Sequence, residues 1–288
     1  MANNDIKAIM VVGAGQMGAG IAQVSAVAGY KVTLNDISAE AARRGYDGIA
    51  ANLARSVAKE RCTAEEREAA LSRIAQSVTL DDAKDCDLVI EAATENVALK
   101  REIFKTLDKA APDHAIFATN TSSVPITELA ACTTRPSKVI GMHFMNPVPV
   151  MKLVEIIRGL ETCEEVREVI ADVTTRLGKI PVEVKDSPGF VSNRILLPML
   201  NEAVYCLYEG IGDPEAIDTV MKLGMNHPMG PLALADLIGL DTCLSIMEVL
   251  YDGFKDSKYR PCPLLRQYVQ AGRLGVKSGR GFYAYERA

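Results

Sequence analysis

The chain has 288 residues, of which 48% are hydrophobic and 24% charged, a composition typical of a soluble globular protein with one or two domains. Its formal net charge of −5 excludes a generally basic nucleic-acid-binding surface, so an anionic ligand needs a local cluster of cations.

The first part of the chain alternates between short apolar runs and longer helical stretches. Strands are expected at 7–12, 31–36, 87–92, 115–120, 138–142, 153–157 and 180–184. Helices are expected at 17–28, 97–110 and 164–177, with two more in the long polar stretch 39–73. Strands that alternate with helices predict a Rossmann-type α/β domain with a mostly parallel sheet.

The pattern changes after Asp186, where alternating strand-like runs stop. Helices are expected at 190–209, 214–223, 233–251 and 264–271. This predicts a Rossmann-type domain over 1–186, followed by a smaller all-α domain over 187–288.

A glycine-rich turn follows the first expected strand. Residues 13–18 read Gly-Ala-Gly-Gln-Met-Gly, the spacing G-x-G-x-x-G. Gly13 permits a tight turn, Gly15 lets the backbone approach a pyrophosphate, and Gly18 lets the helix pack closely on the strand. Gln16 and Met17 open that helix, whose N-terminus favours phosphate. The turn therefore predicts a dinucleotide site.

Asp36 lies at the end of the second expected strand, 18 residues after Gly18. A carboxylate there can accept hydrogen bonds from both ribose hydroxyls and would repel a 2′-phosphate, which favours NAD over NADP. The alternative is a turn aspartate that caps the next helix.

The remaining composition indicates a reduced, metal-free protein. The seven cysteines are scattered and form no C-x-x-C pair, as expected for free thiols in the cytoplasm. The three histidines are far apart in sequence, so we expect no metal. The first residues, 1–5, are polar, and the first apolar run, 8–12, is too short to span a bilayer, so neither a targeting nor a membrane segment is expected.

Several longer motifs now carry a resemblance. They are Asn-Thr-Ser-Ser at 120–123, His-Phe-Met-Asn-Pro-Val-Pro at 143–149, Met-Lys-Leu-Val-Glu at 151–155, Pro-Gly-Phe-Val-Ser-Asn-Arg at 188–194, Gly-Pro-Leu at 230–232 and Lys-Ser-Gly-Arg-Gly-Phe-Tyr at 277–283. In order and spacing the chain resembles the 3-hydroxyacyl-CoA dehydrogenases over essentially its whole length. It looks most like their short bacterial branch, the 3-hydroxybutyryl-CoA dehydrogenases. One departure is Met145, where the family usually carries a second Phe, and we expect altered packing there without lost chemistry.

The resemblance implies hydride transfer between NAD(H) and the C3 position of short-chain 3-hydroxyacyl-CoA and 3-oxoacyl-CoA thioesters. Such a reaction needs a group that takes or gives a proton near neutral pH, which suits histidine. His143 follows the strand 138–142, at the edge where open α/β sheets bind ligands. Taken alone, a histidine in that place is more often structural. Glu155 lies in the next strand after a proline-containing return and could reach the imidazole, or could be a surface residue. The resemblance implies that the two form a catalytic pair.

Further residues match family positions. Ser122 matches the serine that contacts substrate, although Ser123 competes and a turn serine is the plain alternative. Asn146 and Asn193 match positions that contact the cofactor or the substrate oxygens, and either could be a capping residue. Glu95 and Lys100 match positions near the nicotinamide ribose and phosphates, and Lys100 could instead lie on a solvated helix face. Lys277 matches a lysine near the cofactor.

The helix expected after Asp36 is locally basic, with Arg43, Arg44, Arg55, Lys59 and Arg61. A solvated helix face explains this composition best. The resemblance, however, places Asn52 and Lys59 against coenzyme A, and the family more often has Ser in place of Asn52.

Two other functions are compatible with parts of this pattern. A dehydrogenase of small 3-hydroxy acids that are not thioesters would share the glycine turn but lack the His143 to Glu155 spacing. A binding or structural protein of this fold, such as a crystallin or a cofactor sensor, need not keep His143, Glu155 and Ser122 together. The partners expected are thus an acyl-CoA substrate, no nucleic acid, no membrane and a second copy in a homodimer, because the helices at 190–208 and 232–251 are apolar nearly all round.

Overall fold

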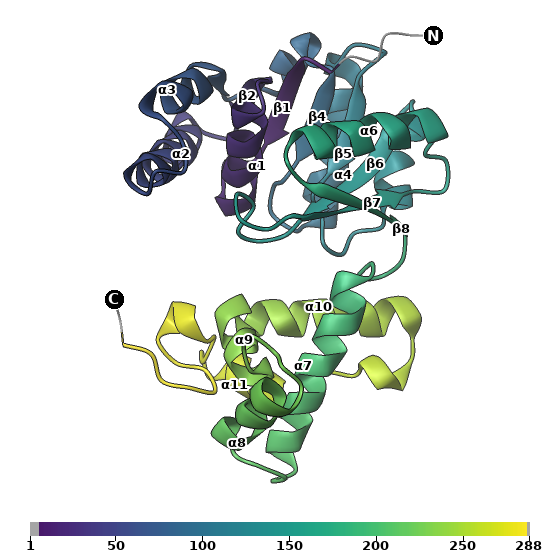
Figure 1. Ribbon diagram of the computed structural model, residues 1–288. Coiled ribbons are helices and arrows are strands. Elements are labelled where there is room, and N and C mark those ends of the chain that lie inside the picture. The colour runs from purple at the N-terminus through teal and green to yellow at the C-terminus, as the bar shows by residue number, and fades with distance from the viewer. Residues whose placement is uncertain (1–5, 287–288) are drawn as a thin grey trace. The chain divides into compact units, whose positions relative to one another are not determined.

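The computed structural model describes residues 6–286, so the polar start at 1–5 lies outside the described residues. The chain divides into two compact units, Met1–Asp186 and Ser187–Ala288 (Figure 1).

The first unit is built on one eight-stranded sheet with the strand order β3-β2-β1-β4-β5-β6-β7-β8. Neighbouring strands run parallel except for the antiparallel pair β6 and β7. The strands are β1 Ala8–Val12, β2 Lys31–Asn35, β3 Ile74–Ser77, β4 Leu88–Glu91, β5 Ile116–Thr119, β6 Val139–Phe144, β7 Leu153–Arg158 and β8 Ile180–Lys185. The strand order reverses between β2 and β4, on either side of β1, which is where such sheets open a ligand crevice at their carboxyl edge.

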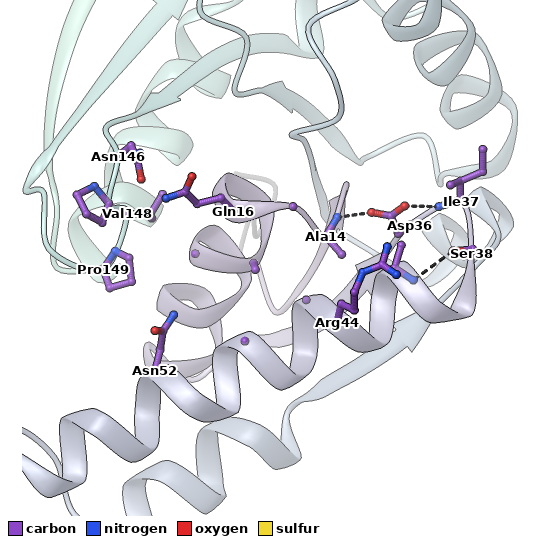
Figure 2. Close-up of a pocket in the computed structure, with 17 residues that line it drawn as sticks. Ala14, Gln16, Asp36, Ile37, Ser38, Arg44, Asn52, Asn146, Val148 and Pro149 are labelled. Carbon is purple, nitrogen blue, oxygen red and sulfur yellow. Dashed lines mark hydrogen bonds between the residues drawn. The ribbon is translucent and has the colours of Figure 1, made fainter. Parts of the chain in front are cut away.

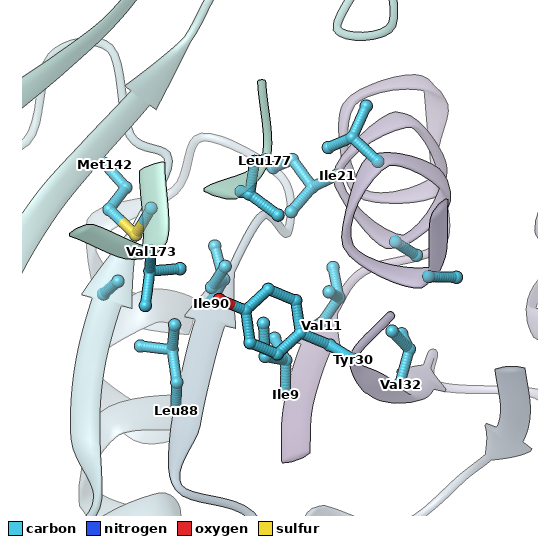
Figure 3. Close-up of a cluster of buried hydrophobic side chains, with 14 of the residues drawn as sticks. Ile9, Val11, Ile21, Tyr30, Val32, Leu88, Ile90, Met142, Val173 and Leu177 are labelled. Carbon is cyan, nitrogen blue, oxygen red and sulfur yellow. The ribbon is translucent and has the colours of Figure 1, made fainter. Parts of the chain in front are cut away.

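Helices cover both faces of this sheet because its central strands are apolar on both sides. They are α1 Gln16–Val27, α2 Ala39–Ala58, α3 Ala64–Ser72, α4 Val97–Ala110, α5 Ile126–Ala130 and α6 Glu164–Arg176, with short 3₁₀ turns η1 Leu80–Asp85 and η2 Pro136–Lys138. Figure 3 shows Ile21 of α1 and Val173 of α6 packed over Ile9 and Ile90 of the sheet. Phe117 points to the opposite face and packs edge-on against Phe104 of α4, with ring centroids 6.1 Å apart.

The second unit is all-helical. Its helices are α7 Ser192–Tyr208, α8 Pro214–Thr219, α9 Pro231–Ile238, α10 Leu240–Phe254 and α11 Pro263–Gln270, with a π turn η3 Val220–Gly224 and 3₁₀ turns η4 Ser257–Tyr259 and η5 Val276–Ser278. Its core gathers apolar residues of four helices, among them Leu197, Leu232, Met247 and Leu265. The expected fold class, a Rossmann-type mostly parallel sheet followed by a smaller all-α part, is confirmed.

The structure corrects the expected elements in three places. Strand β3 and the short helix α5 were not predicted, because neither segment has enough periodicity to stand out. The single helix expected at 233–251 is wrong: Gly239, with φ of 103°, separates α9 from α10, and a helix cannot continue through that conformation.

Candidate functional site

His143 and Glu155 face each other across the antiparallel pair β6 and β7. The expectation that His143 follows the strand is wrong by two residues, since β6 runs on to Phe144. In the register of the two strands His143 lies opposite Glu155, and His143 Nδ1 lies 2.8 Å from Glu155 Oε2. The side chains are 10% and 3% exposed. Because an ionised carboxylate only accepts hydrogen bonds, Nδ1 carries the proton and Nε2 is left with its lone pair when the imidazole is neutral.

The turn that holds Ser122 is fixed by the carboxylate of Glu95. Glu95 Oε1 accepts hydrogen bonds from the backbone N–H of Ser122 at 2.9 Å, from the N–H of Ser123 at 3.0 Å and from the Ser123 hydroxyl at 2.8 Å. The Ser122 hydroxyl lies 3.3 Å from the same oxygen. Burial opposes the charge on Glu95, but Lys100 and these donors outweigh it and hold the pKa of the carboxyl below its ordinary value.

Lys100 is almost fully buried, with 1% of its side chain exposed, so the alternative of a solvated helix face is wrong. Its Nζ lies 2.7 Å and 2.9 Å from the two carboxylate oxygens of Glu91. Glu91 ends β4, is fully buried and was not singled out from the sequence. The signal that could have found it is a carboxylate closing an otherwise apolar strand, which is costly unless a cation meets it.

The glycine turn leaves the space that a dinucleotide needs. A Cβ on Gly18 would lie 1.8 Å from the carbonyl oxygen of Gly13, and a Cβ on Gly13 would lie 2.6 Å from Ala92 O. A Cβ on Gly15 would meet no atom within 4 Å. Gly13 and Gly18 are thus required by packing, whereas Gly15 keeps open space in front of the first turn of α1. That turn has no side-chain cap, so its N–H groups remain for an anion. These features fit the pyrophosphate of NAD.

Asp36 is tied to the same turn. Its Oδ2 accepts a hydrogen bond from Ala14 N at 2.7 Å, and its Oδ1 accepts one from Ile37 N at 2.7 Å, as Figure 2 shows. Helix α2 is capped by Ser38, which accepts from Ala41 N, so Asp36 is not the helix cap. The carboxylate retains further lone pairs for ribose hydroxyls.

A pocket of about 690 Å³ lies between this turn, α2 and the loop after β6 (Figure 2). Gln16 and Asn146 line it, while Met17 packs against the hydrophobic core. A second groove of about 730 Å³ shares Asn52, Pro147 and Pro149 with the first, so the two adjoin. Its lining side chains include five cations and no carboxylate: Arg55, Lys59, Arg61, Arg176 and Lys179.

The cations of α2 differ in how they are engaged. Arg43 pairs with Asp47 and Arg44 with Glu40, each one helical turn away, and Arg44 also lines the first pocket. Lys59, at the C-terminal cap of α2, lines the second groove. The basic character of this helix is therefore divided between a solvated face and a cationic groove.

The two expected site residues of the second unit lie at helix ends. Asn193 is in the first turn of α7, where its N–H donates to Gly189 O. Lys277 lies in η5, and its Nζ is 2.5 Å from Asp241 Oδ1.

The described residues, 6–286, contain no cluster of three His, Cys, Asp or Glu side chains placed to hold a metal ion. Within the same range no helix is both long and apolar enough to cross a membrane. All seven cysteines are free thiols.

Comparisons with known proteins follow the same two-unit division. The family model described as 3-hydroxyacyl-CoA dehydrogenase, NAD binding domain, matches residues 8–187, and its C-terminal domain model matches residues 189–285. A probable 3-hydroxybutyryl-CoA dehydrogenase of Bacillus subtilis is 64% identical over 98% of each chain. A 3-hydroxybutyryl-CoA dehydrogenase of Bradyrhizobium diazoefficiens is 57% identical over 98% of this chain and 97% of its own. The crystal structure of (S)-3-hydroxybutyryl-CoA dehydrogenase from Ralstonia eutropha superposes with a TM-score of 0.96 at 53% identity, covering 98% of this chain and all of the other.

Proposed function

The chain belongs to the 3-hydroxyacyl-CoA dehydrogenase family, an NAD-dependent oxidoreductase family, and on that premise we propose that it interconverts 3-hydroxybutyryl-CoA and acetoacetyl-CoA by a proton relay through His143 and Glu155. The observation that supports the relay is the 2.8 Å contact between His143 Nδ1 and Glu155 Oε2, whose side chains are both largely buried. By extension from the Ralstonia relative, we propose the (S) isomer as the hydroxy substrate.

His143 acts as the proton carrier. Its Nε2 accepts the proton of the 3-hydroxyl during oxidation and returns it to the carbonyl oxygen during reduction. Glu155 keeps the proton on Nδ1, so that Nε2 presents a lone pair, and it balances the imidazolium charge that forms. Ser122 contributes a hydroxyl that hydrogen-bonds the C3 oxygen, and Asn193 holds the same oxygen or its neighbour on the thioester.

NAD is the cofactor, and when bound it accepts or donates the hydride. Gly13, Gly15 and Gly18 with Gln16 and Met17 hold its pyrophosphate at the start of α1. Asp36 binds the adenosine ribose and excludes a 2′-phosphate. Glu95, Asn146 and Lys277 serve the nicotinamide end, and Lys100 does so through Glu95. These assignments are supported by the open space at Gly15 and the anchoring of Asp36 on Ala14.

The cationic groove serves coenzyme A. Asn52 lies where the groove meets the dinucleotide pocket, and Lys59 is placed farther along it. Of the five cations, Arg176 pairs with Asp172, and Lys179 bonds the carbonyls of Val148 and Met151. Arg55, Lys59 and Arg61 supply positive charge that suits a ligand with several phosphate charges. This feature favours a CoA thioester over a free 3-hydroxy acid.

We also propose a homodimer formed through the second unit, and a cytoplasmic location consistent with seven free thiols. The second unit leaves several large apolar side chains more than half exposed: Ile195, Ile211, Val220, Leu223, Met225 and Leu237. Such a concentration of exposed apolar area on one small helical unit is typical of a protein interface.

The experiment is a spectrophotometric assay of NADH oxidation. Acetoacetyl-CoA should be reduced rapidly, free acetoacetate should not, and NADPH should replace NADH poorly. Turnover of acetoacetate at a comparable kcat/KM would favour a dehydrogenase of free acids. A chain that binds NADH but turns over neither substrate would favour a binding or structural role.

A further inference from the structure

A closed ring of hydrogen bonds lies below the turn that carries Ser122. Lys100 Nζ bonds Glu91 and lies 3.3 Å from Glu95 Oε2. Glu95 Oε1 accepts from the Thr121 hydroxyl at 2.5 Å, Thr121 N donates to the Thr119 hydroxyl at 3.1 Å, and that hydroxyl donates to Glu91 Oε2 at 2.7 Å. The ring joins the ends of β4 and β5 to the first turn of α4.

All the hydrogen-bond donors of Lys100 are occupied within this ring. Its ammonium has three N–H donors, and four acceptor oxygens surround them: both carboxylate oxygens of Glu91, one of Glu95, and Ala93 O at 3.3 Å. With 1% of the side chain exposed, the charge has no open path to a phosphate. Lys100 therefore acts on the site through what it holds.

Glu91 is held as tightly as Lys100. Besides the ammonium it accepts hydrogen bonds from Ala93 N at 2.7 Å and from Thr119. A buried ion pair is costly to desolvate, and replacing it with apolar residues is often neutral for stability. The Glu91–Lys100 pair lies at the carboxyl edge of the sheet and contacts Glu95, the carboxylate that holds the turn of Ser122. A role in positioning Glu95 explains this pair better than a contribution to the stability of the fold.

We propose that Glu91 and Lys100 are positioning residues for the reaction, which fix Glu95 and through it the backbone and hydroxyl of Ser122; this inference rests on the proposed function. Glu95 grips the turn mainly by the N–H groups of Ser122 and Ser123, at 2.9 and 3.0 Å. The contact to the Ser122 hydroxyl is longer, at 3.3 Å.

This arrangement suits a reversible reaction. When the substrate carries a 3-hydroxyl, that hydroxyl gives its proton to His143 Nε2, and the Ser122 hydroxyl donates to the same oxygen. When the substrate carries a 3-oxo group, the Ser122 hydroxyl donates to the carbonyl oxygen. The main chain stays in place during both, because its N–H groups remain on Glu95.

The test uses Lys100→Met and Glu91→Gln in the full chain, with Asp108→Asn as a matched control. Asp108 lies near the other end of α4 and pairs with Arg135 at 2.8 Å, with side chains 9% and 11% exposed, so it is a largely buried pair away from the site. For each variant we measure the melting temperature, kcat, KM for acetoacetyl-CoA and the Kd of NADH.

All three variants should melt at a lower temperature, but only Lys100→Met and Glu91→Gln should lower kcat, by roughly 10- to 100-fold, with a smaller rise in the NADH Kd because Glu95 also serves the nicotinamide end. In a Ser122→Ala background, Lys100→Met should lower kcat by less than about a further 3-fold, because the effects of residues that act as a unit are not additive. Lys100→Arg, which keeps the charge, should recover part of the lost kcat.

Three results would overturn the inference. A raised NADH Kd with normal kcat in Lys100→Met would place Lys100 on the cofactor. Fully additive losses with Ser122→Ala would separate it from the serine turn. An equal fall of kcat in Asp108→Asn would reduce the effect to general destabilisation. If Lys100→Met does not fold, Glu91→Gln decides by the same criteria. Failure of the unaltered chain to turn over acetoacetyl-CoA would overturn the proposed function itself. If the unaltered chain turns over acetoacetyl-CoA normally, any of the three results above overturns the positioning role alone.

Discussion

His143 and Glu155 lie directly opposite each other on antiparallel strands, and the side chains meet at 2.8 Å with almost no exposure to water. A pair on adjacent strands of a central sheet is held more rigidly than one on loops, since the backbone ladder sets both Cα positions. The contact fixes which ring nitrogen carries the proton, and this leads to the first prediction.

His143→Ala should lower kcat by about 10³-fold or more, and Glu155→Gln by about 10²-fold or more, because the proton carrier is lost in one and its orientation and charge balance in the other. The double variant should lower kcat by a factor much smaller than the product of the two single factors. The NADH Kd should stay nearly unchanged, because the glycine turn is a separate element. Near-normal turnover of His143→Ala, or fully multiplicative losses, would show that the proton relay uses other residues.

Two glycines of the same turn should respond differently to one added methyl group. Gly18→Ala should strongly destabilise the protein, because its Cβ would collide with Gly13 O at 1.8 Å, a backbone atom that cannot easily move. Gly15→Ala meets no atom within 4 Å and should change the unfolding free energy by less than about 1 kcal/mol.

Gly15→Ala should nevertheless weaken NADH binding by about 10-fold or more, since the methyl group occupies the space in front of the helix N-terminus. Urea unfolding measures the first effect and calorimetric titration with NADH the second. Unchanged NADH binding in Gly15→Ala would mean that the pyrophosphate lies elsewhere.

Lys59→Ala should raise the KM for acetoacetyl-CoA by roughly 5- to 30-fold, the loss expected for one charge-assisted phosphate contact. It should scarcely change turnover of an acetoacetyl-pantetheine analogue, which lacks the nucleotide. Arg43→Ala is the matched control, because Arg43 is also on α2 but pairs with Asp47 outside the groove. An equal loss for both substrates would show that Lys59 acts on another part of the reaction.

Light scattering at micromolar concentration should give the mass of two chains. Leu223→Glu should shift the protein to a single chain, because it places a charge among the exposed apolar residues of the second unit, where Leu223 is 82% exposed. Leu160→Glu, at an equally exposed apolar position of the first unit, is the control and should remain dimeric. A single-chain mass for the unaltered protein would refute the dimer.

Glu95 should make the free energy of unfolding depend on pH in the acid range. Its pKa is held below the ordinary value in the folded chain, so the unfolded chain binds a proton first as the pH falls. The resulting stability is present above the ordinary glutamate pKa, near pH 4.3, and is lost as the pH drops through the lowered folded value. In Glu95→Gln the unfolding free energy should therefore fall less steeply from about pH 5 to pH 3, measured by urea unfolding across that range. Parallel curves for the two proteins would contradict this role.

The sequence by itself determined the features that depend on local spacing. The three glycines of the turn, the aspartate after the second strand and the alternation of strands and helices identify a Rossmann-type unit, because each records a backbone conformation or a periodicity of neighbouring residues. The family motifs extend this to the substrate class and imply, without showing it, that His143 and Glu155 form a pair.

Only the tertiary structure decided which side chains are buried together. Lys100 reads as a surface lysine on a polar helix, and its burial depends on Glu91, which arrives from a strand that the local pattern treats as merely apolar. Gly239 likewise gave no sign that it would break a helix, since a positive φ is imposed by packing and not by the residue. The strand register sets His143 opposite Glu155, and the hydrogen-bond ring ties Lys100 to the turn of Ser122. Both depend on contacts between segments that are distant in the sequence, so no local pattern of residues predicts them.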